Sequence, residues 1–526
     1  MRPRRAPAPA ARGGRPAART HTPSARTRRT RAVAWVAATV AGTLLATGCS
    51  PAPGQQDGVQ PTDTSPTVTL DTAVGRGDAD LPDPDDPVYD EALSTPRTDP
   101  VYPVVGNPVV DALHYDLQLA WDPDARLLTG HETLVLRAAR TAPRLVLDLS
   151  DSLDVTAVAL DGEALDPTAV THARDDVTIK AGVVRNERYV LELDYEGTPE
   201  PVAAPTTRSD FSTTGWTTGT DGSTWTMQEP YGAFTWYAVD DQPADKAFYD
   251  ITVSVPEGWT AVANGRVVGD DTTDGVRTTH WQLGSPAASY LVTLATGEYE
   301  TTALVQGDTP VTTYVPQGSS RAVAVAAAPD ALNWVTGWLG AYPYDSLGVL
   351  VVDSDSGMET QTMLTLGDTE YATSQAVLVH EIVHQWYGDL VTPTDWRGLW
   401  MNEGMAMYLQ VVWQVEHGSS VTMRQVAATW AAQDQALRRR YGPPGAPDPE
   451  SFGASNVYYS PALMWHRLRE RIGDARFRAL VRAWPQQHAD GNATSAQMIA
   501  WWSRRSGVPA SFFRSWLYSE TSPARG

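Results

Sequence analysis

One stretch, HEIVHQWYGDLVTPTDWRGLWMNEG, constrains this chain more than any other part of its sequence. His380 and His384 stand four residues apart with Glu381 between them, and Glu403 follows after eighteen intervening residues. Residues i and i+4 of a helix share one face, so both imidazoles can bind one Zn²⁺ ion. Catalytic zinc commonly takes three protein ligands and leaves a fourth position for water, which makes Glu403 the expected third ligand. Glu381 is then expected to face that water as a general base.

The residues around the two histidines favour a buried helix. Ser374 is a suitable N-cap, Gly388 lies near the expected end, and the apolar residues between them occupy more than one side of the helix. The alternative interpretation is structural, with two histidines that simply pack inside the protein. A further glutamate on a second predicted helix, residues 402–415, weighs against it because it completes a set of metal ligands.

The chain of 526 residues is long enough for two or more domains. Residues 105–305 alternate between apolar and polar side chains with turn signals between the runs, which predicts a large antiparallel β domain. Residues 318–526 are mixed at first and then mainly helical. Long helices are expected over residues 321–339 and 421–440, and Thr494 begins a capping box before the last helical segment.

The region around the histidines resembles the zinc aminopeptidase family typified by aminopeptidase N. Family members carry HExxH, eighteen residues and then glutamate, and the segments Gln385–Thr392 and Trp400–Ala406 are similar to the family's blocks around these ligands. The resemblance covers roughly residues 105 to 520. It implies a metalloaminopeptidase, a hydrolase that binds one zinc ion per chain through His380, His384 and Glu403 and releases N-terminal amino acids from peptides.

The same resemblance implies a multidomain β + α/β fold. An N-terminal antiparallel β domain shaped like a saddle is expected over residues 101–305, followed by a thermolysin-like, mostly helical zinc catalytic domain over residues 306–526.

An upstream loop resembles the family's G-x-M-E-N element. It contains Gly357, Met358 and Glu359, whereas Ser356 and Thr360 differ from the more common family residues. The resemblance implies that this loop binds substrate and that Glu359 holds the free α-amino group, which is a cation near neutral pH. The structural alternative is a glutamate on a solvated turn.

A downstream segment, VYYSPA, resembles the family element that carries a catalytic tyrosine. Alignment on Ala462 places that tyrosine at Tyr458, whose phenol is expected to donate a hydrogen bond to the oxyanion. Tyr459 is the rival assignment, and packing of both rings without a catalytic role is the structural alternative. Ser460 and Pro461 are expected at the N-cap and in the first turn of the following helix.

The segment QEPYGAFTWYAVDDQPADKAFYD, residues 228–250, resembles a fourth family block. Gln228 matches the glutamine that lines the subsite for the substrate's N-terminus, and Glu229 beside it is a weaker candidate. Asp241 and Lys246 also match, with a role that is more structural than catalytic.

The N-terminal residues predict export. Residues 1–48 contain ten arginines, no acidic residue and a short apolar run, which together are typical of a signal peptide. Cys49, the only cysteine, follows Ala-Thr-Gly as in the lipobox of a bacterial lipoprotein, so a membrane anchor and an extracytoplasmic location are expected. A cleaved signal with a spare cysteine is the alternative. Residues 49–100 are rich in acidic residues and proline and are expected to form a disordered tether.

Charge restricts the partners. Without the signal, 30 basic residues face 62 acidic residues, a surface that repels nucleic acid. The expected partners are peptides with a free N-terminus. Two rival functions stay open at this point: a thermolysin-like endopeptidase, which needs no amine-binding glutamate, and a catalytically silent lipoprotein that binds peptides.

Overall fold

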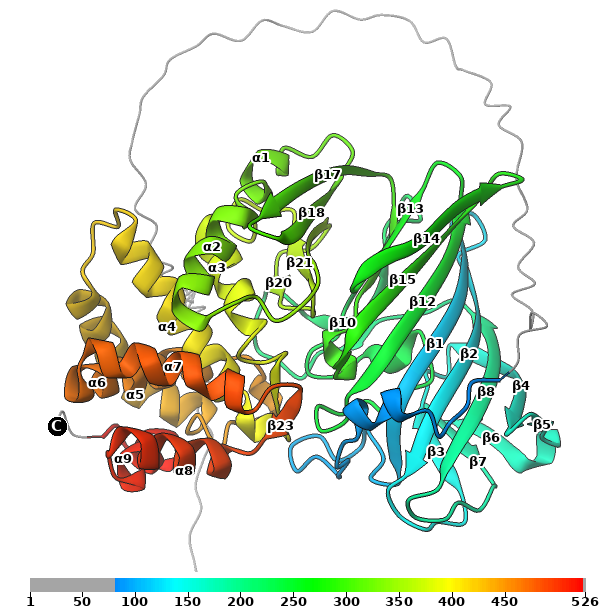
Figure 1. Cartoon of the computed structure of the whole chain (residues 1–526), viewed down its shortest axis with the longest axis horizontal. Coiled ribbons are helices and arrows are strands. Elements are labelled where there is room, and N and C mark those ends of the chain that lie inside the picture. The colour runs from blue at the N-terminus through cyan, green and yellow to red at the C-terminus, as the bar shows by residue number, and fades with distance from the viewer. Residues whose placement is uncertain (1–80, 524–526) are drawn as a thin grey trace, which may run out of the picture. The chain divides into compact units, whose positions relative to one another are not determined.

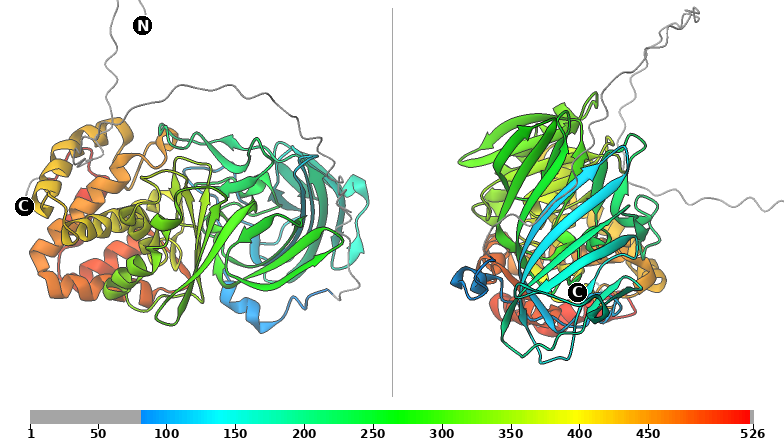
Figure 2. Two further views of the ribbon diagram at one scale, coloured as in Figure 1. Left: turned by 90° about the horizontal axis from the view of Figure 1, so that it is seen from above. Right: turned by 90° about the vertical axis from the view of Figure 1, so that its right-hand side faces the viewer.

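A computed structural model describes residues 81–523 of the chain (Figure 1). The first part of this region is dominated by an eight-stranded sheet, which Figure 2 shows to be strongly curved. In spatial order its strands are β14 (Arg266–Thr273), β15 (Val276–Ala287), β12 (Ala247–Pro256), β1 (Val110–Asp122), β2 (Leu127–Ala138), β8 (Arg188–Gly197), β4 (Leu153–Leu160) and β5 (Glu163–Ala164). Neighbouring strands are antiparallel except β1 and β12, which pair in parallel.

The predicted alternation explains how this sheet packs. Along β1, Tyr115, Leu117 and Leu119 are buried, whereas the residues between them are half-buried. Two smaller sheets complete this β domain. One is formed by β13 (Thr260–Ala263), β16 (Leu294–Gly297), β11 (Thr224–Met227), β10 (Thr213–Thr218) and β9 (Val202–Ala203), and the other by β3 (Leu145–Asp148), β7 (Asp176–Ile179) and β6 (Val170–Ala173). The antiparallel β domain predicted from the sequence is therefore confirmed.

The second part of the chain joins a five-stranded sheet to a group of helices, and we call it the helical domain. The sheet has the order β17 (Tyr299–Gln306), β18 (Thr309–Pro316), β19 (Leu347–Val352), β21 (Met363–Gly367) and β20 (Gly357–Met358). The helices are α1 (Ala322–Val325), α2 (Ala328–Leu339), α3 (Gln375–His384), α4 (Trp400–Glu416), α5 (Met423–Tyr441), α6 (Ser455–Ile472), α7 (Asp474–Gln487), α8 (Ser495–Ser506) and α9 (Ala510–Tyr518). Two short strands, β22 (Val391–Pro393) and β23 (Gly491–Ala493), pair in parallel.

Three details differ from the sequence predictions. The helix expected over residues 321–339 is split into α1 and α2, because Pro329 lies in the first turn of α2 and cannot continue a preceding helix. Since β17 pairs with β18, the helical domain begins at Tyr299 rather than after residue 305. Pro461 lies inside α6, which begins at Ser455, so the predicted helix start at Ser460 is wrong.

The predicted tether is wrong for residues 81–100. A short 3₁₀ helix, η1 (Pro87–Ala92), places Tyr89 and Ala92 in a buried cluster with Leu113 and Val135 of the large sheet. Residues 49–80, Cys49 and the predicted signal over residues 1–48 lie outside the described region. Within residues 81–523, no helix is long and apolar enough to cross a membrane.

The two domains share a buried contact that brings the β domain close to the helix carrying the histidines. Lys246, at the edge of β12, is buried and donates from Nζ to the carbonyl oxygen of Asp389, 2.7 Å away, shortly after α3. Asp241 accepts from the backbone N–H of Gly232 at 2.8 Å and from Oγ of Ser289 at 2.7 Å. These contacts fit the structural role expected for both residues.

We predict that Lys246 makes stability depend on alkaline pH. Burial lowers the pKa of the Lys246 ammonium from 10.5 to about 8. Between these values the folded state binds fewer protons than the unfolded state, so the contribution of Lys246 to the free energy of unfolding rises with pH. Between pH 7.5 and about 9.5, the free energy of unfolding of wild type should therefore rise relative to that of Lys246→Met. Denaturant titration at each pH measures both values.

Lys180 provides the matched control, because its ammonium is exposed and also donates to a backbone carbonyl, that of Thr168. Lys180→Met shows what the loss of an exposed ammonium does over the same pH interval, and the change for Lys246→Met is measured relative to it. A difference for Lys246→Met that stays constant or falls with pH would contradict the lowered pKa.

Candidate metal centre

Helix α3 presents both histidines of the motif to one site. It begins after Ser374, whose hydroxyl accepts from the backbone N–H of Val377, so the predicted N-cap is confirmed. His380 and His384 lie one turn apart with ring centroids separated by 4.9 Å, and both are buried. The i, i+4 spacing therefore produces the shared face that the sequence predicts.

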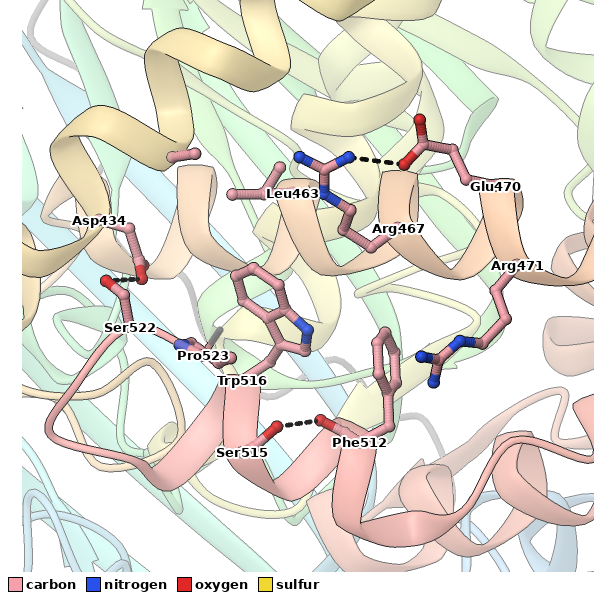
Figure 3. A pocket seen from close by; sticks show the side chains of 11 residues that line it. Asp434, Leu463, Arg467, Glu470, Arg471, Phe512, Ser515, Trp516, Ser522 and Pro523 are labelled. Carbon is pink, nitrogen blue, oxygen red and sulfur yellow. Dashed lines mark hydrogen bonds and ion pairs between the residues drawn. The ribbon is translucent and has the colours of Figure 1, made fainter. Parts of the chain in front are cut away.

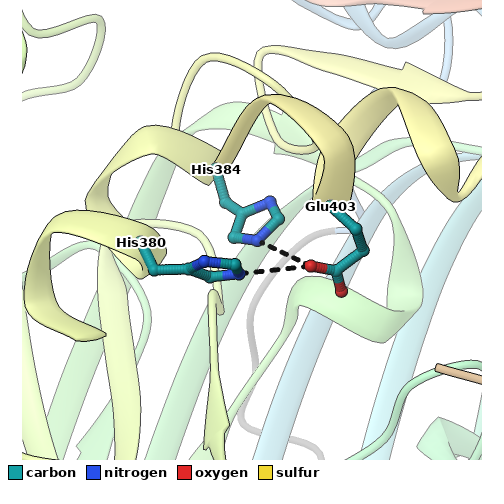
Figure 4. Close-up of side chains that lie close together, drawn as sticks. All are labelled: His380, His384 and Glu403. Atoms are coloured by element: carbon teal, nitrogen blue, oxygen red, sulfur yellow. Dashed lines mark hydrogen bonds and ion pairs between the residues drawn. The ribbon is translucent and has the colours of Figure 1, made fainter. Parts of the chain in front are cut away.

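Glu403 reaches the same site from the first turn of α4 (Figure 4). Its Oε2 lies 3.2 Å from Nε2 of His380 and 3.5 Å from Nε2 of His384. The three side chains form a group that could hold a metal ion, and two imidazoles with one glutamate are a ligand set of catalytic zinc sites. The predicted metal ligands thus converge at one point.

The outer nitrogens of both rings are held by other groups. Nδ1 of His380 lies 2.9 Å from the amide oxygen of Gln410, and Nδ1 of His384 lies 3.1 Å from the carbonyl oxygen of Tyr387. Both acceptors require the hydrogen on Nδ1, which leaves the Nε2 lone pairs directed at the metal position. Gln410 has no counterpart in the sequence prediction, although its position two turns after Glu403 on α4 could have suggested it.

Negative charge is concentrated around the two imidazoles. The buried carboxyl groups of Glu359 and Glu381 and the half-buried Glu229 surround His384 and Glu403. Burial raises the pKa of the Glu381 carboxyl to about 7, the value of a group poised to accept and return a proton near neutral pH. Burial also tends to raise the pKa of the Glu403 carboxyl, but the adjacent imidazoles of His384 and His380 lower it below its ordinary range. A cluster with this excess of buried acid is suited to cations.

The loop predicted to bind substrate lies beside the metal group. Gly357 and Met358 form β20, and a Cβ at Gly357 would lie 3.1 Å from Oε1 of Glu381, so glycine leaves room for the predicted base. Met358 is buried in the core of the β domain. Glu359 is buried, its Oε1 accepts no hydrogen bond, and this atom lies 3.9 Å from Nδ1 of His384.

The prediction for Gln228 is corrected in favour of its neighbour. The Gln228 amide donates to the carbonyl of Ser289 at 2.7 Å and accepts from Nε1 of Trp236 at 2.9 Å, so both of its ends are engaged inside the β domain. Glu229 is the residue that lies against Glu359 and Glu403, and its Oε1 has no hydrogen-bond partner. The alternation of side chains along an extended segment could have identified Glu229. Thr224, Thr226 and Gln228 are fully buried on one side, so the next residue, Glu229, points to the other side.

The two candidate tyrosines point to different parts of the structure. The Tyr458 ring stacks on His380 with centroids 6.1 Å apart, and its pKa is raised by burial and by Glu403. Tyr459 instead stacks on Trp430, at 6.1 Å, on the side of α5. The geometry favours Tyr458 as the residue beside the metal group. Arg208, which donates to the Tyr458 hydroxyl, was not predicted from the sequence because no motif contains it.

A separate cavity of about 430 Å³ lies between α5, α6 and α9 and is unrelated to the metal group (Figure 3). Arg467 and Glu470 pair at its wall, and Phe512 and Trp516 supply apolar surface. It shares no lining residue with the site described above.

Similarity to known proteins agrees with this site. Residues 111–291 match the Peptidase M1 N-terminal domain, and residues 330–516 match the Peptidase family M1 domain. The chain is 27% identical over 319 residues to aminopeptidase M1-C of Oryza sativa subsp. japonica, an alignment covering 56% of this chain and 36% of the relative. It is 26% identical over 325 residues to aminopeptidase N of Streptomyces lividans, covering 53% of this chain and 36% of the relative.

The curated relatives are longer, and this chain spans half of their length or less. A solved structure is matched over nearly its full length. It is a mutant M1 zinc metallopeptidase of Deinococcus radiodurans bound to a Tyr-Ser-Ala substrate, with a TM-score of 0.71 and 25% identity, covering 81% of this chain and 98% of that chain. With both domains matched in order and the ligand set of the motif assembled in space, the chain belongs to the M1 peptidase family.

Proposed function

We propose that this protein is a zinc-dependent aminopeptidase that releases amino acids from the free N-termini of peptides. The observation that carries the proposal is the combination of His380, His384 and Glu403 with two further carboxyl groups, those of Glu229 and Glu359, each of which has a buried oxygen without a hydrogen-bond partner. The first group is a ligand set for a divalent metal ion, and the second offers an anionic subsite for one more cation.

Each residue of the site has its own role in the proposed reaction. A bound zinc ion supplies a Lewis acid for the scissile carbonyl and lowers the pKa of a bound water to about 7. Glu381 lies beside the ligands with a pKa near 7, so it can accept the proton of the attacking water and pass it to the leaving amine. The Tyr458 hydroxyl donates to the carbonyl oxygen as negative charge develops there.

The second pair of carboxylates supports an exopeptidase over an endopeptidase. Glu229 follows β11 in the β domain and Glu359 follows β20, and burial together with the nearby Glu359 raises the pKa of the Glu229 carboxyl, so the two acidic side chains lie close together beside the metal group. A free α-amino group is a cation that compensates this buried negative charge, whereas the neutral backbone of an internal peptide bond does not. Amine recognition is therefore supported both by the charge of Glu229 and Glu359 and by their location beside the metal group.

We also propose that the enzyme is exported and anchored by a lipid on Cys49, outside the cytoplasm of a bacterial cell. The support comes from the sequence alone, namely the basic N-terminus, the short apolar run and the Ala-Thr-Gly-Cys order at its end. Mass spectrometry of the membrane fraction should detect an acylated N-terminal cysteine, and a mature chain that begins elsewhere would contradict the anchor.

The Gln410 contact leads to a prediction on metal affinity. Gln410→Ala removes the acceptor that fixes His380, so the zinc dissociation constant should rise by about 10- to 100-fold. Competition with a chromophoric chelator measures this constant without reference to activity. Gln414→Ala, one turn further along α4, should leave the affinity unchanged. Equal affinities for Gln410→Ala and wild type would show that the contact does not orient the ligand.

The role of Glu381 is tested by Glu381→Gln. The variant keeps the three ligands, so elemental analysis should find one zinc per chain as in wild type. The value of kcat on an aminoacyl p-nitroanilide should fall by about 100-fold or more, because general-base catalysis contributes on that scale. Chelation of the metal should abolish wild-type activity, and zinc should restore it. Retention of wild-type kcat by Glu381→Gln would refute its assignment as the base.

The role of Glu229 is tested by selectivity. Glu229→Gln should lower kcat/KM for peptides with a free N-terminus by about 10-fold or more, because it removes one charge facing the substrate amine. Glu257→Gln, an exposed residue of the same domain, is the control. The proposal of an aminopeptidase is contradicted if wild type cleaves N-acetylated peptides at internal bonds as efficiently as free peptides.

A further inference from the structure

Arg208 enters the active site from the β domain, in the loop between β9 and β10. This loop is fixed to the segment just before α6. The backbone N–H of Phe452 donates to the carbonyl of Pro205 at 2.8 Å, and Oγ1 of Thr206 donates to the carbonyl of Phe452 at 2.7 Å. Oγ1 of Thr206 also accepts from the backbone N–H of Arg208 at 3.1 Å. The loop is therefore held against the helix that carries Tyr458.

The guanidinium of Arg208 has a fixed orientation. Its Nε donates to Oδ1 of Asp210 at 3.0 Å while Nη2 donates to Oδ2, which makes a bidentate pair. The Phe211 ring lies 4.6 Å from Cζ of Arg208, a cation–π distance. Gly453 provides room, since a Cβ there would lie 3.2 Å from Nη1. The remaining donor, Nη1, is aimed at the Tyr458 hydroxyl oxygen, 3.1 Å away.

This contact determines where the phenol hydrogen can point. A guanidinium only donates hydrogen bonds, so it occupies a lone pair of the Tyr458 oxygen and forces the O–H bond in another direction. The other polar groups near the hydroxyl are the carboxyl groups of Glu403, a ligand of the metal group, and of Glu229. The hydrogen is thereby directed to the side of the metal group.

We propose that Arg208 is a positioning residue for Tyr458, which holds the phenol oxygen and presents its hydrogen to the reacting carbonyl. The proposal rests on the aminopeptidase function proposed above. Tyr458 comes from the helical domain and Arg208 from the β domain, so the oxyanion donor is completed only when the two domains are docked.

A double-mutant cycle tests the proposal. Arg208→Met should lower kcat by roughly 10- to 100-fold with KM changed less than about threefold, because the lost orientation matters in the transition state. In a Tyr458→Phe background, Arg208→Met should change kcat by less than about threefold, since the group it positions is gone. Equal losses in both backgrounds, or no loss in the wild-type background, would overturn the proposal.

Matched variants separate positioning from folding. Arg277 forms a similar bidentate pair with Asp270 in the β domain, so Arg277→Met should lose a comparable ion pair and keep wild-type kcat. Arg208→Lys keeps a charged donor and should recover part of the kcat that Arg208→Met loses. If Arg208→Met does not fold, Arg208→Lys in the two backgrounds completes the cycle, and a loss that is the same in both again overturns the proposal.

Crystal structures provide a readout that does not depend on activity. In Arg208→Met the Tyr458 ring should leave its stacked position on His380, whereas in Arg277→Met it should stay. An unchanged, fully ordered Tyr458 in Arg208→Met would overturn the positioning role. If wild type hydrolyses no aminoacyl substrate, the proposed function fails, and the crystal structures still decide whether Arg208 positions Tyr458.

Discussion

The site depends on four carboxyl groups gathered around two imidazoles, three of them on buried side chains and the fourth, Glu229, on a half-buried one. Burial of an anion is costly unless a cation compensates it, and the two imidazoles lie closest to Glu403. Glu229 and Glu359 keep oxygens without partners. Such an arrangement attracts positive charge from outside, which the proposed function supplies as a metal ion and as the amine of a peptide. Electrostatics therefore links the fold, the metal and the choice of substrate in this protein.

The site is shared between the two domains. The ligands and the base come from α3 and α4, whereas Glu229 and Arg208 belong to the β domain. The hydrophobic core of the β domain also includes residues from the segments that lead into α4 and α6 and from the first turn of α6, namely Trp396, Leu399, Phe452 and Val457. Because these segments pack on the β domain, its position fixes the position of the catalytic groups. Neither domain contains the complete site by itself.

Much of the site could be predicted from the sequence because its central part is local. The i, i+4 pair and the N-cap at Ser374 are encoded within one helix, so spacing alone placed His380 and His384 together. The assignment of Gln228 failed because it relied on the similarity of the motif alone. The alternation of side chains along the segment directs Gln228 into the β domain. Arg208 was beyond prediction, since 250 residues separate it from Tyr458 and no local pattern connects them. The start of α6 was misplaced because Ser460 and Pro461 match the usual N-cap and first turn of a helix, whereas α6 begins at Ser455 and continues through Pro461.

Pro461 lies against Gly404, the residue directly after Glu403 of the metal group. A Cβ at this position would lie 2.6 Å from Cβ of Pro461 and 2.8 Å from its Cγ, so α4 and α6 approach each other only because residue 404 has no side chain. The bare backbone at residue 404 sets the spacing between the carboxylate on one helix and the phenol on the other. One added methyl group, far smaller than any substrate, would force these two helices apart and change the width of the gap in which a peptide bond must be held.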